Sequence, residues 1–272
     1  MDATNDAIDR VREPVVAGTF YPSNPDDLGY MLDRLLANAT PRPPHAAPPK
    51  AIIAPHAGYL YSGPIAATAY RALESRRDEI TRVVLLGPSH RVPLRGLALP
   101  TAAAFATPLG EVAIDGAAAR HLQSMPSVVV DDEPHADEHS LEVQLPFLQR
   151  VLGPDWILVP VAVGHATPLA VADVLAVLWG GTETAVVVST DLSHYHDYAT
   201  AADLDQRTAE AIVSRDVDAI STTDACGANP LRGLLELTQR AGLEIELLDL
   251  RSSGDTAGDR TKVVGYGAFA VA

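Results

Sequence analysis

Short apolar runs alternate with longer segments of helical character along most of this chain, and this alternation limits the folds it can adopt. Runs with the length and composition of buried strands occupy residues 51–54, 83–86, 156–163 and 185–188. Segments with helical length and apolar spacing occupy residues 65–73, 141–152, 168–179 and 201–213. Buried strands joined through helices favour a parallel sheet covered on both faces. We therefore expect an α/β fold: a single domain with a mostly parallel or mixed central sheet flanked by helices.

Two regions break this alternation. Residues 97–114 are punctuated by glycine and proline, which indicates an antiparallel excursion from the main sheet. Residues 244–250 and 263–271 have the composition of strands, and a loop rich in glycine and aspartate joins them at residues 252–259. We therefore expect some antiparallel strands beside the parallel ones.

The first fifty residues have a different organisation. Asn24, followed by a proline and two acidic residues, is typical of a helix start, and we expect that helix to end near Leu36. Residues 40–49 contain five prolines, which predicts a stiff, extended linker. We interpret the chain as one domain with three parts: an N-terminal appendage at residues 1–39, a Pro-rich linker at 40–49 and the main α/β core at 50–272.

Three of the predicted strands are each followed closely by a histidine. These are His56, His90 and His194. The carboxyl ends of parallel strands meet at one edge of the sheet, where open α/β proteins bind their ligands. Neutral imidazole is the commonest metal ligand in proteins and the usual general base near neutral pH. The spacing indicates one shared site, and the alternative is that each histidine is an ordinary loop residue.

Cys226 is the only cysteine, and it precedes a predicted helix at residues 231–240. The N-terminus of a helix lowers the pKa of a nearby thiol and favours a thiolate or a metal ligand. A lone cysteine is also commonly a buried and inert side chain. The sequence alone leaves both interpretations open.

An acidic segment at residues 131–142 carries further candidates. It contains His135, His139 and Glu142, and we expect Pro134 and the surrounding acids to prevent a helix there. The pairing of histidine with glutamate suits groups that surround a metal site. A solvated acidic loop is the alternative.

The charge and composition exclude several function classes. The formal net charge is -15, from 20 basic and 35 acidic residues, so we expect no binding to nucleic acid and none to anionic membrane surfaces. We find no apolar signal segment, no membrane-spanning run and no Gly-rich phosphate loop. A single cysteine permits no intramolecular disulfide, and we expect a cytoplasmic protein.

At these motifs the sequence resembles the Memo family, whose prokaryotic members include a protein of the AmmeMemoRadiSam system. The resemblance runs in family order over nearly the whole chain. The matching stretches are residues 17–22 (AGTFYP), 52–63 (IIAPHAGYLYSG), 86–90 (LGPSH), 107–110 (TPLG), 138–146 (EHSLEVQLP), 189–195 (STDLSHY), 225–227 (ACG) and 258–266 (GDRTKVVGY).

The Memo family is similar in structure to the class III extradiol dioxygenases, which hold non-haem iron. The resemblance implies that His56, His90 and Cys226 are the metal ligands, and that His194 is a catalytic acid/base with Asp191 beside it. The dioxygenases have a carboxylate where this chain has Cys226, and a thiolate invites Cu(+) as well as Fe(2+).

Further residues are expected around the metal or in contact with a substrate. These are His139, Glu142, Tyr59 and Ser89. The function implied is that of a redox-active, metal-dependent protein that is similar to a dioxygenase.

A different function remains open, in which the crevice is a non-catalytic module that binds a peptide or a partner protein. The AmmeMemoRadiSam system suggests an AMMECR1-like protein and a radical-SAM protein as partners. A degenerate dioxygenase retained as a structural subunit is a third interpretation.

Overall fold

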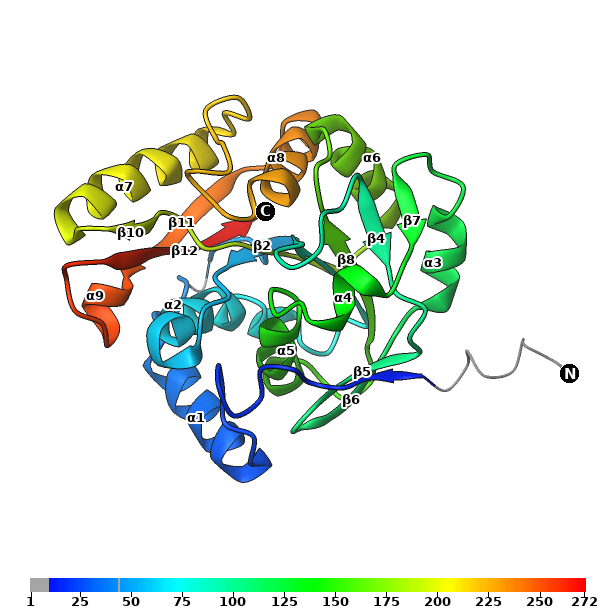
Figure 1. Cartoon of the computed structure of the whole chain (residues 1–272), viewed down its shortest axis with the longest axis horizontal. Coiled ribbons are helices and arrows are strands. Elements are labelled where there is room, and N and C mark those ends of the chain that lie inside the picture. Colours follow the sequence, from blue (N-terminus) through cyan, green and yellow to red (C-terminus); the bar gives the residue numbers. More distant parts are fainter. Residues whose placement is uncertain (1–9, 44) are drawn as a thin grey trace, which may run out of the picture.

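The computed structural model describes residues 10–43 and 45–272, and these residues form a mixed α/β fold (Figure 1). In chain order the elements are β1 (Val11–Arg12), α1 (Pro25–Asn38), β2 (Ala51–Ala54), α2 (Tyr59–Arg71), η1 (Glu74–Arg76), β3 (Arg82–Pro88), β4 (Leu97–Leu99), β5 (Ala104–Thr107), β6 (Gly110–Ala113), α3 (Gly116–Leu122), β7 (Val128–Val130), α4 (Glu133–Ala136), η2 (Glu142–Gln144), α5 (Leu145–Val151), β8 (Ile157–Val163), α6 (Pro168–Leu178), β9 (Thr184–Ser189), β10 (His194–His196), α7 (Tyr198–Ser214), α8 (Ala228–Ala241), β11 (Ile245–Ser252), α9 (Ser253–Thr256) and β12 (Val263–Val271).

The main sheet is mixed, as expected. Among the described residues it has nine strands, in the order β10-β12-β2-β9-β3-β8-β4-β7, and β11 pairs with β12 as well. The four central strands β2, β9, β3 and β8 are mutually parallel, whereas β12 and β4 run antiparallel to their neighbours β2 and β8. The carboxyl ends of β2, β9, β3 and β8 therefore share one edge of the sheet.

Helices cover both faces of this sheet (Figure 1). One core contains residues of α1, α2 and α5, together with Leu85 and Val187 from the sheet. The other contains residues of α6, α7 and α8, together with Val84 and Val188. Adjacent residues of β3 and β9 thus point into opposite cores, because side chains alternate along a strand. This two-sided burial explains the uninterrupted apolar runs in the sequence.

The N-terminal helix forms as its sequence predicts. The side-chain oxygen of Asn24 accepts hydrogen bonds from the backbone N–H groups of Asp26 (2.9 Å) and Asp27 (3.1 Å). Leu28 and Leu32 of α1 are fully buried in the core shared with α2 and α5. The appendage and linker of the sequence interpretation include residues 1–9 and 44, which lie outside the described residues.

The excursion at residues 97–114 has two parts. Strand β4 adds to the main sheet antiparallel to β8, and β5 and β6 form a hairpin that pairs with β1 in a separate small sheet. One local expectation is wrong, because a helical turn, α4, forms around Pro134. A proline is tolerated in the first turn of a helix, where its missing N–H leaves no helical hydrogen bond unmade.

None of the helices in the described part of the chain combines the length and apolar character needed to cross a bilayer.

Candidate metal centre

The loops that follow the central strands bring the predicted residues to one edge of the sheet. His56 follows β2, His90 follows β3, and Asp191 and His194 follow β9. Together with His139 and Tyr195 they line a cavity of about 400 Å³. The topology therefore confirms the inference that these strands end on the same side, and the cavity collects their polar side chains.

His56 is buried and hydrogen-bonded on several sides. Its backbone N–H donates to Oδ1 of Asp191 (2.8 Å), its Nδ1 lies 2.7 Å from Oγ of Ser189, and its Nε2 lies 3.2 Å from Sγ of Cys226. Burial, followed by the nearby imidazoles of His90 and His139, holds the pKa of His56 well below its usual value. His56 is therefore neutral, which is the form that binds metal ions.

His90 is held by Glu138. Its backbone N–H donates to Oε2 of Glu138 (2.5 Å), and its Nδ1 lies 2.9 Å from Oε1 of the same carboxylate. Burial alone would raise the pKa of Glu138, but hydrogen bonds from His90 and from the Ser140 N–H bring it down to about 2. An ionised carboxylate only accepts hydrogen bonds, so Nδ1 of His90 carries a proton.

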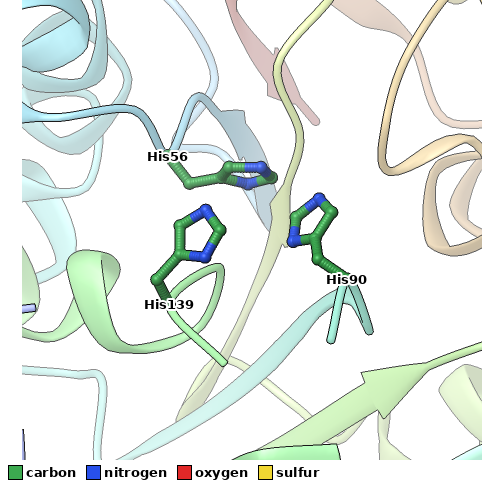
Figure 2. A group of neighbouring side chains, drawn as sticks. All are labelled: His56, His90 and His139. Atoms are coloured by element: carbon green, nitrogen blue, oxygen red, sulfur yellow. The ribbon is translucent and has the colours of Figure 1, made fainter. Parts of the chain in front are cut away.

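His139 completes a group of three imidazoles (Figure 2). His139 stacks on His90 with ring centroids 5.0 Å apart, and its ring meets that of His56 edge-on at 5.5 Å. One ring nitrogen from each of the three histidines lies within 4.8 Å of the other two. Nδ1 of His139 makes no hydrogen bond among the described residues, although it lies 3.3 Å from Oε1 of Glu138.

Cys226 approaches the group from the turn before α8. Its Sγ accepts a hydrogen bond from the backbone N–H of Asp191 (3.3 Å). Burial, with a further contribution from the Asp191 carboxylate, raises the pKa of the thiol to about 12. The lowered pKa expected of a cysteine near a helix N-terminus is therefore not found, because burial outweighs the helix.

The imidazoles of His56, His90 and His139 form the group that could share a single metal ion, and Cys226 lies beside His56. Bond lengths of about 2.0–2.1 Å to nitrogen and 2.3 Å to sulfur place two ligands of one ion roughly 3.1–3.6 Å apart for angles between 90° and tetrahedral. The separation of 3.2 Å between His56 Nε2 and Cys226 Sγ lies in that range. Imidazole nitrogens, and a thiol that loses its proton on binding, suit soft or borderline ions such as copper, zinc and iron.

Asp191 and His194 occupy the same cavity in different ways. Burial raises the pKa of Asp191 to about 7, against the opposing effect of the hydrogen bond from the His56 N–H. Burial lowers the pKa of His194, and its ring lies beside that of Tyr195 at a centroid distance of 5.8 Å. Asp191 accepts a hydrogen bond from the backbone N–H of His56, so Asp191 holds the loop that carries His56.

The remaining predicted residues lie further from the histidines. Ser89 donates to the carbonyl of Val92 (2.7 Å) and lines a second cavity, of about 780 Å³, which shares His90 with the first. Tyr59 and Glu142 are not brought to either cavity in the described structure. Tyr59 donates to the carbonyl of Val143 (2.6 Å), whereas Glu142 accepts from Tyr21 (2.6 Å) and forms an ion pair with Arg12.

Sequence reasoning missed three residues that hold the histidines in place. Glu138 directly precedes His139, and its hydrogen bonds to His90 could not be predicted because it is one of several acidic residues in that segment. Ser189 is the last residue of β9, and Gln144 lies in η2; both are fully buried. A polar residue at the end of an apolar strand was the available signal for Ser189.

A mixed sheet whose central parallel strands end beside three imidazoles and a thiol defines a candidate metal-binding protein of the α/β class. A family model for Memo-like proteins matches residues 12–270, and the chain belongs to the Memo family. Similar proteins are described as MEMO1 family proteins. One from Aeropyrum pernix is 36% identical over 96% of this chain and 100% of its own length, and one from Methanopyrus kandleri is 36% identical over 95% and 98%.

Two further proteins are similar to this chain in sequence or in structure. A MEMO1 family protein of Aquifex aeolicus is 34% identical over 94% of this chain and 97% of its own length. Among solved structures, an uncharacterized protein of Escherichia coli K12 is 13% identical, with a TM-score of 0.49 over 80% of this chain and 98% of that one.

Proposed function

We propose that this Memo-family protein is a metal-dependent redox protein that holds Fe(2+) or Cu(+) between His56, His90 and Cys226. The observation that carries the proposal is the meeting of His56 Nε2 and Cys226 Sγ at 3.2 Å beside the rings of His90 and His139. The four residues come from four separate segments of the chain, and a bound cation explains why they converge.

The chain's own residues supply positions and protons around the ion. A bound iron or copper ion would contribute redox chemistry and Lewis acidity at the cavity. His194 is on the cavity wall, and its lowered pKa keeps its ring neutral and able to accept a proton from a substrate. Asp191, with a pKa of about 7, can exchange a proton near neutral pH.

Metal analysis of protein purified without oxygen tests this proposal. The parent is expected to bind about one iron or copper ion per chain, and His56→Ala and Cys226→Ala are each expected to lose most of that binding. His121→Ala changes an exposed histidine on α3 and serves as the matched control. Variants of His56 and Cys226 that bind both metals as well as the parent would show that the ligand set is wrong.

Substitution of His139 tests whether its imidazole binds the metal ion or only lies beside it. If it binds the ion, His139→Ala weakens metal binding as strongly as His90→Ala does. If it only shapes the cavity, His139→Ala leaves metal affinity close to that of the parent. Either result is read directly from the same anaerobic titration.

The second candidate function is that of a module that binds a peptide or a partner protein. The charges that line the two cavities, together called the crevice, support this function. Among the described residues, the lining of the larger cavity includes Arg95 and no aspartate or glutamate, and the lining of the smaller one includes Arg91 and Asp191. In a chain of net charge -15 this makes the crevice less acidic than the rest of the surface. Co-purification of an AMMECR1-like or radical-SAM protein with metal-free chain would support this function, and loss of that partner with Arg95→Glu would assign it to the crevice.

A further inference from the structure

We propose that Ser189 is a positioning residue that locks His56 in the tautomer with its proton on Nδ1, and that Gln144 holds Ser189 in the orientation this requires. The effect of this fixed tautomer on metal affinity rests on the proposed function. The lock itself is a property of the metal-free protein and follows from the buried hydrogen bonds.

The orientation of the Gln144 amide is fixed first. Its Nε2 lies 2.9 Å from the carbonyl oxygen of Pro55, and its Oε1 lies 2.7 Å from the hydroxyl of Tyr70. A carbonyl oxygen only accepts hydrogen bonds, so the NH2 group of Gln144 must face Pro55. The opposite orientation would place two carbonyl oxygens against each other in the core. Tyr70 therefore donates to Oε1, and the second N–H of Gln144 points to Ser189.

The single proton of Ser189 is assigned next. Gln144 Nε2 donates to Ser189 Oγ at 2.9 Å, and Oγ lies 2.6 Å from the carbonyl oxygen of Ser140. The Nε2 group of Gln144 can only donate a hydrogen bond, and the Ser140 carbonyl can only accept one. The hydroxyl proton of Ser189 therefore lies in the hydrogen bond to Ser140. Ser189 has no second proton to give.

The remaining contact of Ser189 sets the tautomer of His56. Nδ1 of His56 lies 2.7 Å from Ser189 Oγ, and with the hydroxyl proton committed elsewhere Nδ1 must be the donor. A neutral imidazole carries one proton, so Nε2 is left with a free lone pair, and the Nε2 atom lies 3.2 Å from Cys226 Sγ. All of these side chains except Cys226 are almost completely shielded from solvent. Water therefore offers no competing partner.

His90 shows the same arrangement with a different partner. Glu138 accepts a hydrogen bond from its Nδ1 at 2.9 Å, so that nitrogen likewise carries a proton. One imidazole is thus fixed by a carboxylate and the other by a neutral hydroxyl. Outer hydrogen bonds of this kind orient ligand rings, and removing one typically lowers metal affinity by about 10–100-fold.

Nuclear magnetic resonance on the metal-free parent tests the lock without any substitution. Long-range proton–nitrogen correlations in protein labelled with ¹⁵N at histidine distinguish the protonated ring nitrogen from the bare one. We expect His56 to be protonated at Nδ1. A His56 ring protonated at Nε2 in the parent overturns the inference, whatever metal binding shows.

Substitution then measures the consequence, with Co(2+) absorbance under anaerobic conditions as the probe. Ser189→Ala removes the acceptor, so we expect loss of the fixed Nδ1–H tautomer and about 10–100-fold weaker Co(2+) binding. Gln144→Met keeps the Ser189 hydroxyl and is expected to lose less affinity. Thr238→Val removes a hydroxyl that is equally buried in α8, and it should leave the His56 tautomer and the Co(2+) affinity unchanged.

The outcomes separate this inference from the proposed function. A Ser189→Ala protein that keeps both the parent tautomer and the parent Co(2+) affinity overturns the inference. If Gln144→Met binds Co(2+) as tightly as the parent does, Gln144 does not hold Ser189 in place and is removed from the inference. A parent with the Nδ1–H tautomer that binds neither cobalt, iron nor copper refutes the proposed function and leaves the tautomer lock established.

Discussion

Nε2 of His56 and Sγ of Cys226 lie 3.2 Å apart, although 170 positions separate the two residues in the sequence. The contact joins the loop after β2 to the turn before α8 across the edge of the sheet. Because the thiol is almost fully protonated without metal, its sulfur is a ligand only when an ion displaces the proton.

The choice between copper and iron is expected to depend on this sulfur. Cys226→Ser replaces a soft ligand by a hard one, so Cu(+) affinity should fall by at least about tenfold more than Fe(2+) affinity. Competition titrations with a chelator for each metal measure the two losses. Equal losses for both metals would show that sulfur does not select the ion.

A buried histidine outside the site is expected to make the fold sensitive to acid. Burial lowers the pKa of His135 to about 4 from an ordinary value of 6.5, while its Nε2 donates to the carbonyl of Ala98 (3.0 Å). The unfolded chain therefore binds this proton more readily, and stability is lost as the pH falls from 6.5 towards 4. The loss amounts to about 3 kcal/mol at most.

Urea unfolding at several pH values between 4 and 7 measures this effect. His135→Gln keeps a donor for Ala98 and has no titrating ring, so its stability should depend less steeply on pH than that of the parent. His121→Gln, at an exposed position, should follow the parent. Identical pH profiles for His135→Gln and the parent would assign the acid sensitivity to other groups.

Tyr195, which lines the smaller cavity, is expected to lower the stability of the fold because of its backbone conformation. Its backbone is left-handed, with φ at 62°, and the residue is 71% exposed. Asparagine tolerates this conformation far better than an aromatic residue does. Tyr195→Asn should therefore raise the free energy of unfolding by about 1 kcal/mol.

Tyr30→Asn is the control for that prediction, because Tyr30 is similarly exposed on α1 with ordinary helical backbone. It should show no gain in chemical or thermal unfolding. A clear loss of stability in Tyr195→Asn would mean that the packing of its ring outweighs the backbone strain.

Glu142 is expected to stabilise the fold and to leave metal binding unaffected. Its carboxylate is fully buried, pairs with Arg12, and accepts N–H groups of Val15 (2.9 Å) and Val16 (3.0 Å). Glu142→Gln leaves the Arg12 guanidinium without its counter-charge and should cost about 3–5 kcal/mol of stability.

The double variant Arg12→Met with Glu142→Gln should recover part of that stability, because no unpaired charge remains. Metal titration of Glu142→Gln should match the parent once the protein is folded. A fall in metal affinity beyond the loss of folded protein would place Glu142 in the metal centre after all.

Local patterns were sufficient where short-range physics decides the outcome. The apolar runs at residues 51–54 and 185–188 became the central strands β2 and β9, and Asn24 caps α1 as expected. The prediction that Pro134 prevents a helix was wrong, because a proline disfavours the interior of a helix but not its first turn.

The sequence by itself determined the alternation of strands and helices, and thereby the edge at which His56, His90 and His194 gather, because parallel strands end on the same side. Only the tertiary structure decided that the ring of His139 joins them, that Glu142 and Tyr59 turn into the core, and that Ser189 and Glu138 orient the rings. Those contacts depend on how loops from distant segments pack together. Periodicity and composition, which are local properties of a chain, do not specify such packing.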